Sequence, residues 1–509
     1  MGLLGYFLGI DIGTYESKGC LIDESFRVIR TAAVSHDLSI PRPGWAEHDA
    51  EAVWWRDFVR LCRELLDGTV KRDLVAVGCS AIAPAMLPVD PRGVPLRPAI
   101  LYGIDTRAHR EIRELEKTLG VARIKETCWN PLSSQSVGPK ILWFKRNEPD
   151  LYEKTWKVMT ATTFLVFKLT GEVVVDYYTA SAFTPLLNLN KLEWDESLAD
   201  LLVSPSTLPE PRWTTELAGE VTREAADLTG IPAGTPVIVG TADAAAEFVS
   251  AGAGMPGDLM IMLGTTVFLI EQLSRRADVP ALWSSVFLWP KTFCVAGGMA
   301  TGGALTRWFR DHFAAEELAL EREAGVNAYE TLWRRAAEIP PGGPGLMVLP
   351  YFSGERTPIN DPAARGAILG LSLSHGKYHV YRALLEGISF GIRHNLDHIE
   401  EAMPPARVLV VGGGARNPLW LKIIASVIGR DLLVPPVKVG ASYGDALLAA
   451  MSQGLIEPAG LPRLFADSYE RVCPDEGLSR TYAEYYAVYR GVWDDIKGWI
   501  HRLAELGGA

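Results

Sequence analysis

The chain has 509 residues, of which 48% are hydrophobic and 22% are charged. This length exceeds the size at which one hydrophobic core stops growing, so at least two domains are expected, and the composition excludes a disordered chain. The net charge of −11 argues against a nucleic-acid partner, because such proteins need a basic surface to displace counterions.

The six cysteines are scattered without the spacing of a metal site or a disulfide framework, which indicates reduced thiols. No stretch approaches the roughly 18 consecutive apolar residues of a membrane span. Residues 1–10 are apolar but run directly into Asp11, which favours a first core strand over a signal peptide. The sequence therefore predicts a cytoplasmic protein with no membrane partner.

Strand-like and helix-like segments alternate along the chain, the pattern of an α/β protein. Three strands are predicted first, over Tyr6–Ile12, Gly19–Ile22 and Phe26–Val34, followed by helix over Glu51–Leu66. A three-stranded meander leading into helices matches the start of the actin-like ATPase architecture. In that architecture two such modules face each other.

The turn after the first strand has the residues of a phosphate site. Gly13 lets the backbone approach a phosphate closely, Thr14 and Ser17 offer hydroxyl donors, and Lys18 supplies positive charge. Asp11, at the strand end, is expected to hold Mg²⁺ through water. An ordinary hairpin is the alternative interpretation of this turn taken alone.

Asp243 ends the apolar run Val237–Val239 and precedes a helix-like segment, Ala244–Phe248. One interpretation is a carboxylate that caps the helix N-terminus. The other is a general base that takes the proton from a substrate hydroxyl as it attacks a γ-phosphate, a role worth about 10² to 10⁴ in rate.

A second module is predicted to begin near residue 250. Strand Leu259–Leu263 meets a Gly-Thr-Thr turn and a further strand, Val267–Ile270; later come strands Leu346–Leu349 and Val408–Val411 and helix Pro418–Ile428. From about residue 476 a terminal helix is predicted, with Trp493, Ile496 and Trp499 on one face. The expected domains are residues 1–250, 251–475 and the terminal helix 476–509.

The glycine-rich turns of the second module suit a nucleotide. Small residues and hydroxyls there offer backbone donors to phosphates and let adenosine lie against the backbone, although each turn alone could be an ordinary αβ connection. The predicted ATP contacts in this module are Gly264, Thr265, Thr266, Gly303, Gly413, Gly414 and Asn417.

Taken in order, these segments resemble the FGGY family of carbohydrate kinases, from about Leu8 to Met451, with the xylulokinase-like members nearest in pattern. Beyond the turns named above, the matching segments are Gly44–Glu47, Trp54-Trp55, Gly93–Ile100, Asp105 with Arg107, Leu169–Glu172, Asp176, Ala180-Ser181, Gly354–Pro358, Asp361-Pro362, Arg365-Gly366, Arg382–Gly387 and Gly412–Trp420.

The resemblance implies two actin-like (ribonuclease H-like) domains that face each other across a cleft, with ATP on one wall and a sugar or polyol on the other. It implies Asp243 as the base, Asp11 and Asp243 on the side of Mg²⁺, and, by family habit, a homodimer. The expected substrate contacts are Trp45, Glu47, Ile82, Ala83, Tyr102, Asp105, Arg107 and Asp243.

The chain departs from the xylulokinase pattern at the sugar. Ile82-Ala83-Pro84 stand where a Gln-Met-His triplet is usual, and Ala244 replaces the usual Asn after the catalytic Asp. Apolar groups therefore replace polar sugar contacts, and a site built to bond a hydroxyl discriminates strongly by its presence. We predict that D-xylulose is not the best substrate and that a shorter, less hydroxylated or differently configured ketose or polyol is preferred.

The predicted function is an ATP-dependent carbohydrate kinase that phosphorylates a hydroxyl of a ketose or polyol. Two alternatives stay open from the sequence: an actin-like nucleotide-binding sensor without kinase activity, and a kinase of a non-sugar hydroxylated acceptor. The residues do not tell which sugar is used, which hydroxyl is phosphorylated, or the oligomeric state.

Overall fold

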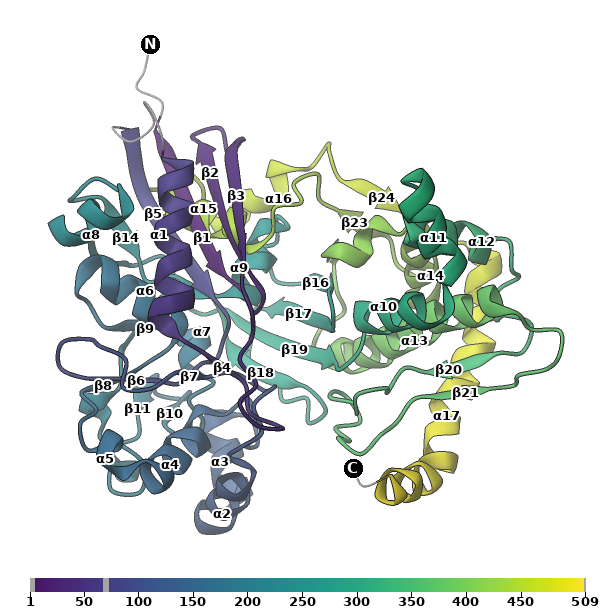
Figure 1. Ribbon diagram of the computed structural model, residues 1–509, viewed down its shortest axis with the longest axis horizontal. Helices are drawn as coiled ribbons and strands as arrows, with labels where there is room; N and C mark the ends of the chain where they lie inside the picture. The colour runs from purple at the N-terminus through teal and green to yellow at the C-terminus, as the bar shows by residue number, and fades with distance from the viewer. Residues whose placement is uncertain (1–4, 67–72, 508–509) are drawn as a thin grey trace.

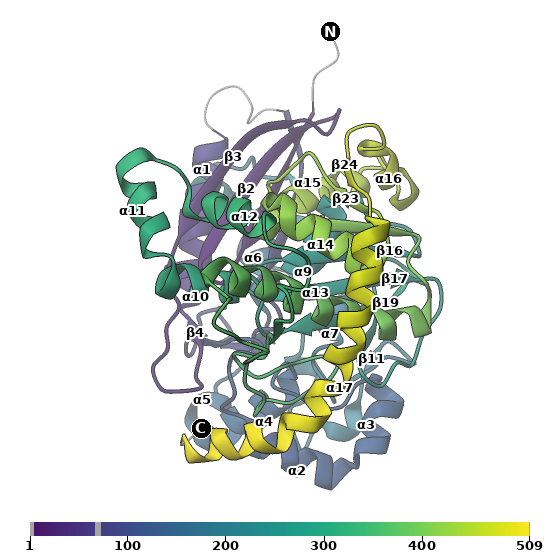
Figure 2. The same cartoon turned by 90° about the vertical axis from the view of Figure 1, so that its right-hand side faces the viewer.

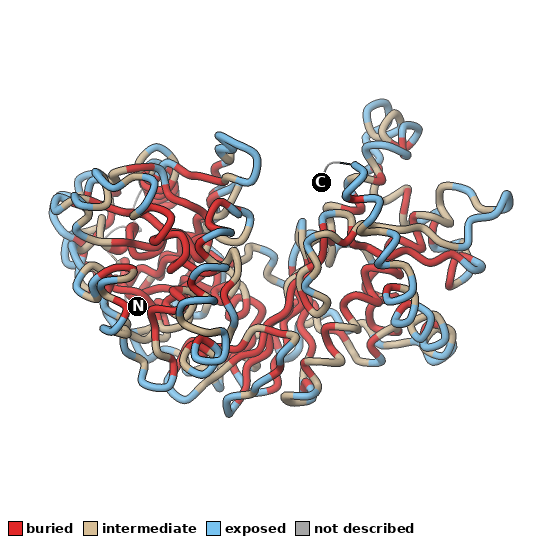
Figure 3. The backbone as a smooth tube through the Cα atoms, turned by 90° about the horizontal axis from the view of Figure 1, so that it is seen from below, coloured by how far each residue is buried: buried red, intermediate tan, exposed pale blue. Residues whose placement is uncertain are grey.

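The computed structural model describes residues 5–66 and 73–507. Within them the chain forms two α/β halves, each built on a large mixed sheet (Figure 1). Figure 3 shows the buried backbone concentrated in the middle of each half, with exposed segments around the outside. In the described part of the chain, no helix has both the length and the apolarity that crossing a membrane requires.

The N-terminal sheet carries the predicted meander. Strand β1 pairs antiparallel with β2 and parallel with β5, and its side chains are buried on both faces of the sheet after the first residue. In spatial order the strands are β13 (Leu217–Glu220), β14 (Pro236–Ile238), β5 (Leu74–Ala81), β1 (Tyr6–Ile12), β2 (Glu16–Asp23) and β3 (Val28–Ser35), with β15 (Thr241–Ala242) also on β5.

The C-terminal sheet repeats this plan. Its antiparallel strands β16, β17 and β19 correspond to β1, β2 and β3, and β22 runs parallel to β16 as β5 does to β1. The order is β18 (Trp283–Val286), β19 (Phe293–Met299), β17 (Val267–Leu273), β16 (Asp258–Leu263), β22 (Arg407–Val411), β23 (Leu432–Val434) and β24 (Glu470–Val472). The expected echo of the first module is confirmed at the level of topology.

Shorter strands pair outside the two sheets. They are β4 (Glu47–His48) with β7 (Ala99–Ile100), β6 (Leu87–Val89) with β8 (Lys157–Met159), β9 (Val174–Asp176) with β12 (Glu210–Arg212), β10 (Leu187–Asn188) with β11 (Glu193–Trp194), and β20 (Met347–Leu349) with β21 (Ala367–Leu369).

Helices flank both sheets. In the N-terminal half a π-helical segment, Ala50–Trp55, precedes α1 (Arg56–Leu65), and the others are α2 (His109–Leu119), α3 (Val121–Cys128), α4 (Val137–Asn147), α5 (Pro149–Tyr152), α6 (Ala161–Thr170), α7 (Tyr177–Ala180), α8 (Arg223–Thr229) and α9 (Asp243–Ser250). Later in the chain they are α10 (Gly303–Phe313), α11 (Ala315–Ala324), α12 (Ala328–Ala337), α13 (Lys377–Ala402), α14 (Pro418–Ile428), α15 (Ala441–Ser452), α16 (Leu461–Leu464) and α17 (Glu476–Leu506).

Helix α15 joins the two halves. Although it comes late in the chain, it packs on β1, β2 and β5 of the first sheet and on α9 (Figure 1). A Cβ on Gly9 would lie 1.9 Å from the Ser442 carbonyl oxygen, and one on Gly78 would lie 2.2 Å from that of Asp445. Glycine at both strand positions is therefore what lets α15 approach the sheet.

The terminal helix α17 begins at Glu476, as predicted, and runs along the outside of the C-terminal half (Figure 2). Trp493 packs into the core and is 7% exposed, and Ile496 packs beside it. Trp499 is 75% exposed, so the prediction that it shares the packed face is wrong. Trp499 therefore lies on a side of α17 that does not pack against the core.

Candidate active site

The catalytic candidates meet where three parallel strands of the first sheet end. Asp11 of β1 lies beside Ser80 of β5 in the strand register, and Thr241 of β15 lies on the other side of Ser80. Asp243 follows as the first residue of α9. Its Oδ1 accepts a hydrogen bond of 2.7 Å from the Ala244 amide, so the carboxylate sits at the helix N-terminus, as predicted.

Burial governs the charges at this centre. It raises the pKa of Asp243 to about 6, against the effect of the Ala244 amide. Burial, and next the Asp243 charge, raise the pKa of Asp11 well above its ordinary value, while Ser80 and Lys18 act in the opposite direction. Burial also raises the pKa of Glu247 to about 7. The centre is thus a cluster of carboxyl groups with raised pKa values, and the Lys18 charge acts on two of them, Asp11 and Glu247.

Asp445 of α15 completes the cluster. The Ser80 hydroxyl lies 3.0 Å from Asp11 Oδ1 and 2.8 Å from Asp445 Oδ2, but it has only one proton to donate. Burial, together with the Asp11 charge, raises the pKa of Asp445 well above its ordinary value. The Ser80 hydroxyl therefore bridges the Asp11 and Asp445 carboxyl groups.

The turn between β1 and β2 lies over this cluster. The Gly13 amide bonds to the Glu16 carbonyl, and Thr14 Oγ1 lies 3.0 Å from the Tyr102 hydroxyl. Lys18 pairs with Glu16 at 3.1 Å and acts on the pKa values of Asp11 and Glu247. Gly13, Thr14 and Lys18 are therefore brought to the expected place.

Ser17 points to the opposite face of β2, and its prediction as a phosphate contact is corrected. Its hydroxyl is fully buried and donates to Asp57 at 3.0 Å. His36 contacts the same carboxylate at 2.8 Å and the Gly13 carbonyl oxygen at 3.1 Å. Because side chains alternate along a strand, Lys18 and Ser17 cannot both face the cluster; Ser17 instead supports the turn from below.

A cavity of about 1050 Å³ lies beside the turn between β16 and β17, in the C-terminal half. Aromatic side chains Trp308, Tyr329 and Trp333 from α10 and α12 line it. Of the predicted ATP contacts, it is lined by Gly264, Thr265, Gly303, Gly413, Gly414 and Asn417. The structure thus brings together residues separated by more than a hundred positions in sequence.

The glycines of this cavity have distinct roles. A Cβ on Gly303 would lie 2.6 Å from the Gly264 carbonyl oxygen, which accepts the Gly303 amide at 2.8 Å, so glycine there ties α10 to the turn. A Cβ on Gly413 would meet no atom within 4 Å. Asn417 caps α14, since its Oδ1 accepts from the Trp420 amide at 3.1 Å, and its side-chain NH2 group is left as a donor for a ligand.

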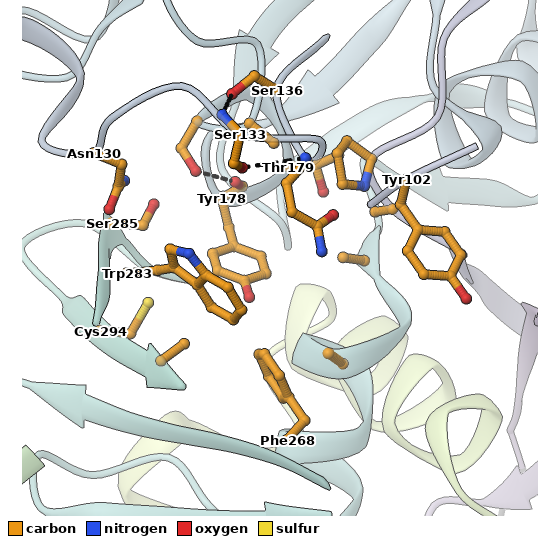
Figure 4. Close-up of a pocket in the computed structure, with 18 of the residues that line it drawn as sticks. Tyr102, Asn130, Ser133, Ser136, Tyr178, Thr179, Phe268, Trp283, Ser285 and Cys294 are labelled. Atoms are coloured by element: carbon orange, nitrogen blue, oxygen red, sulfur yellow. Dashed lines mark hydrogen bonds between the residues drawn. The ribbon is translucent and has the colours of Figure 1, made fainter. Parts of the chain in front are cut away.

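A second cavity, of about 280 Å³, lies between the two halves, and Asp243 lines it. Figure 4 shows other residues of its wall, among them Tyr102, Tyr178 and Trp283. Thr266, which follows the turn lining the first cavity, lines this one, so the β16–β17 turn separates the two spaces. Around Asp243 the lining includes Ala83 and Tyr102 from the predicted set, together with Ala244, which stands where the family usually has Asn. We call it the acceptor cavity.

Several expected substrate contacts do not line the acceptor cavity and are corrected. Arg107 is buried between Glu47, at 2.8 Å, and Asp105, at 2.7 Å, and its guanidinium carbon lies 3.9 Å above the centre of the Trp45 ring. The charged groups of Glu47, Asp105 and Arg107 and the face of the Trp45 ring therefore contact one another. Ile82 is 1% exposed and belongs to the core of the N-terminal half.

Other lining residues were missed. Arg356 lies in a segment that carried the family resemblance, but nothing in that segment indicated that this residue lines a cavity. Its Nη2 group donates to the Met299 carbonyl at 2.8 Å. The remaining unforeseen residues of the acceptor cavity include Asn130, Ser133, Gln135, Tyr178, Met262, Phe268, Trp283, Ser285, Cys294 and Ala296. Most come from strands and loops whose facing side is set by the packing of the two halves.

The centre suits a hydrated magnesium ion. Within residues 5–66 and 73–507, no three His, Cys, Asp or Glu side chains are grouped so that they could hold a metal directly. Mg²⁺ commonly keeps several waters and uses one or two carboxylates together with substrate phosphates. Asp11 and Asp243, whose mutual repulsion contributes to the raised pKa of Asp11, fit that donor set.

Comparison with known proteins gives a consistent result. Models for the N-terminal and C-terminal domains of the FGGY family of carbohydrate kinases match residues 6–250 and 259–453. Xylulose kinase of Staphylococcus xylosus is 27% identical over 497 residues, which cover 96% of this chain and 100% of that protein. Gluconokinase of Bacillus subtilis (strain 168) is 26% identical over 491 residues, covering 96% and 95%.

Among solved structures, the crystal structure of xylulose kinase from Rhodospirillum rubrum superposes with a TM-score of 0.87. It is 30% identical and covers 97% of this chain and 100% of its own. The similarity in sequence and in three dimensions therefore extends over both halves of the molecule.

Proposed function

Because the chain belongs to the FGGY family of carbohydrate kinases, which are ATP-dependent sugar kinases, we propose that it transfers the γ-phosphoryl group of ATP to a hydroxyl of a small ketose or polyol. ATP would occupy the cavity of the C-terminal half and the acceptor would occupy the cavity at Asp243. The observation that carries this proposal is that one turn, Gly264–Thr266, borders both cavities.

Asp243 is the proposed general base. Its pKa of about 6 keeps it ionised at neutral pH and makes it a stronger base than an exposed aspartate. As the acceptor oxygen bonds to the γ-phosphorus, the bond from that phosphorus to the β–γ bridging oxygen breaks, Asp243 takes the hydroxyl proton, and ADP leaves. An acceptor that fills the cavity would displace water, which would otherwise compete for the phosphoryl group.

The surrounding residues would hold the phosphates. The amides of the Gly264–Thr266 turn and the turn at Gly13 and Thr14 lie on either side of the centre, with Lys18 beside them. Mg²⁺, held by Asp11 and Asp243 through water, would offset the charge that develops on the phosphoryl oxygens. Asp445 and Ser80 keep the Asp11 carboxylate in position.

The test is ADP release in a coupled assay with Mg·ATP, across pentuloses, hexuloses, tetruloses, pentitols, glycerol and gluconate. A responding acceptor supports the kinase, and D-xylulose giving the highest kcat/KM would contradict the predicted preference. No release with any acceptor, while ATP still binds, would favour the sensor or a non-sugar acceptor. The domain limits 1–250, 251–475 and 476–509, and the homodimer, stay predictions.

A further inference from the structure

The acceptor cavity has two chemically different ends. Polar groups gather near Asp243. Burial raises the pKa of Tyr102 there, the Asp243 charge raises it further, and the Arg356 charge lowers it. The Gln135 Oε1 atom accepts from the Gly103 amide at 3.0 Å, which keeps its amide nitrogen available. Arg356 Nε is buried without a hydrogen-bond partner in the described structure. A hydroxylated group is therefore accommodated at this end.

The other end is built by the face of the C-terminal sheet that meets the N-terminal half. Trp283 of β18 lies beside Ala296 of β19, and Phe268 of β17 lies beside Gly298 of β19. Side chains on one sheet face stand roughly parallel, so two aromatic residues flank a central strand that carries only small ones. This arrangement leaves an open hollow over β19.

The hollow has aromatic walls. The Trp283 and Phe268 rings are 22° from parallel with centroids 6.5 Å apart, near the outer limit of direct aromatic contact, so both keep ring surface for a ligand. Tyr178 of α7 approaches from the opposite half (Figure 4). Burial raises the pKa of Tyr178 and of the Cys294 thiol, as expected of a poorly hydrated space.

An all-hydroxyl chain matches this end poorly. Among its polar lining side chains, Ser285 Oγ is buried without a partner in the described structure, whereas Asn130 is bonded to the Ser284 carbonyl at 2.7 Å and to the Ser284 amide at 2.9 Å. Further hydroxyls placed against Trp283, Phe268 and Ala296 would lose their water without gaining hydrogen bonds. A flat apolar group would instead bury its surface favourably there.

We propose that the acceptor is an alcohol that carries a flat apolar group, such as an aryl ring, at the end remote from the reacting hydroxyl, and that Trp283 and Phe268 select it. The proposal rests on the proposed kinase function, because the reacting hydroxyl must lie at Asp243. It names a substrate class different from the unsubstituted pentuloses and aldonates after which the related kinases are named.

The experiment compares acceptors that share a polar end. ADP release is measured with glycerol against 3-phenoxy-1,2-propanediol, and with D-xylulose against 1-deoxy-D-xylulose, and binding of each is measured by calorimetry. The variants are Trp283→Ala, Phe268→Ala and, as a matched control, Trp499→Ala, whose ring lies exposed on α17. We expect kcat/KM at least tenfold higher for the phenoxy compound than for glycerol.

The expected result includes loss of that preference, to within about threefold, in Trp283→Ala and Phe268→Ala, whereas Trp499→Ala keeps the preference of the native protein. Preference for the fully hydroxylated member of each pair, unchanged in Trp283→Ala, would overturn the inference and leave the kinase intact. Binding of the phenoxy compound that needs Trp283, without ADP release from any acceptor, would retain the ligand class and overturn the kinase. Neither binding nor release would overturn both.

Discussion

Replacing Gly413 with alanine should weaken ATP binding without weakening the fold. Gly413 lines the cavity proposed for ATP, lacks a positive φ, and has no atom within 4 Å of an added Cβ. The substitution therefore causes no clash in the folded chain, and it reduces the entropy of the unfolded chain, which stabilises by up to about 1 kcal/mol. In the complex the methyl group takes space next to the nucleotide.

Overfilling a packed contact by one methyl typically costs about 1–3 kcal/mol, which corresponds to roughly 5- to 150-fold in Kd. The neighbouring variant Gly414→Ala makes the contrast, because its Cβ would lie 2.6 Å from the Trp420 ring and 2.7 Å from Leu263 Cβ. It should lose about 1–3 kcal/mol of folding stability. Gly491→Ala, on α17 with no atom within 4 Å, controls for the helix effect of alanine.

The assays are calorimetric titration with ATP and thermal unfolding of the three variants. The reasoning predicts a raised Kd with an unchanged or higher Tm for Gly413→Ala, and a lowered Tm for Gly414→Ala. An ATP Kd within twofold of the native value in a folded Gly413→Ala protein would refute the placement of the nucleotide against this backbone.

Two further changes test the buried charges. Burial raises the pKa of Glu271 in β17 to about 8, above its value in the unfolded chain. The contribution of neutral Glu271 to folding stability is therefore fully present below about pH 4.5 and is lost as the pH rises through 8. Glu271→Gln should therefore raise the free energy of unfolding by about 3–4 kcal/mol near pH 8 and by under about 1 kcal/mol at pH 5, and equal gains at both would contradict this. Asp105→Ala should lower stability by about 3–5 kcal/mol, because it removes a buried partner of Arg107. Its KM for acceptor should stay within about threefold in the folded fraction; a large KM change at native stability would restore Asp105 as a substrate contact.

The elements predicted best from sequence are those with a local signal. The strand Tyr6–Ile12 and the helix Pro418–Ile428 have the bounds predicted from apolar runs and turn residues. The glycine turns at Gly264 and Gly413 were also recognisable, because glycine marks places where the backbone must be approached closely. Their meeting in one cavity followed from the family resemblance.

Contacts between residues that lie far apart in the sequence could not be predicted from the sequence. Glu47, Asp105 and Arg107 have the residue types of a sugar site, yet they neutralise one another in the core, and their convergence depends on tertiary folding. Trp283 and Phe268 looked like ordinary strand residues, because which face of β17 and β18 meets the other half cannot be read from alternation. Ser17 was also misplaced. Ser17 and Lys18 are neighbours on strand β2, so their side chains point to opposite faces of the sheet.

The proposed role of Asp243 as the base of phosphoryl transfer is tested with the Asp243→Asn variant. ATP binding and acceptor-dependent ADP release are measured in this variant and in the native protein, with the best acceptor of the panel. We expect an ATP Kd within about threefold of native and turnover reduced about 10² to 10⁴-fold. A folded Asp243→Asn protein that keeps more than about a tenth of native turnover would contradict it.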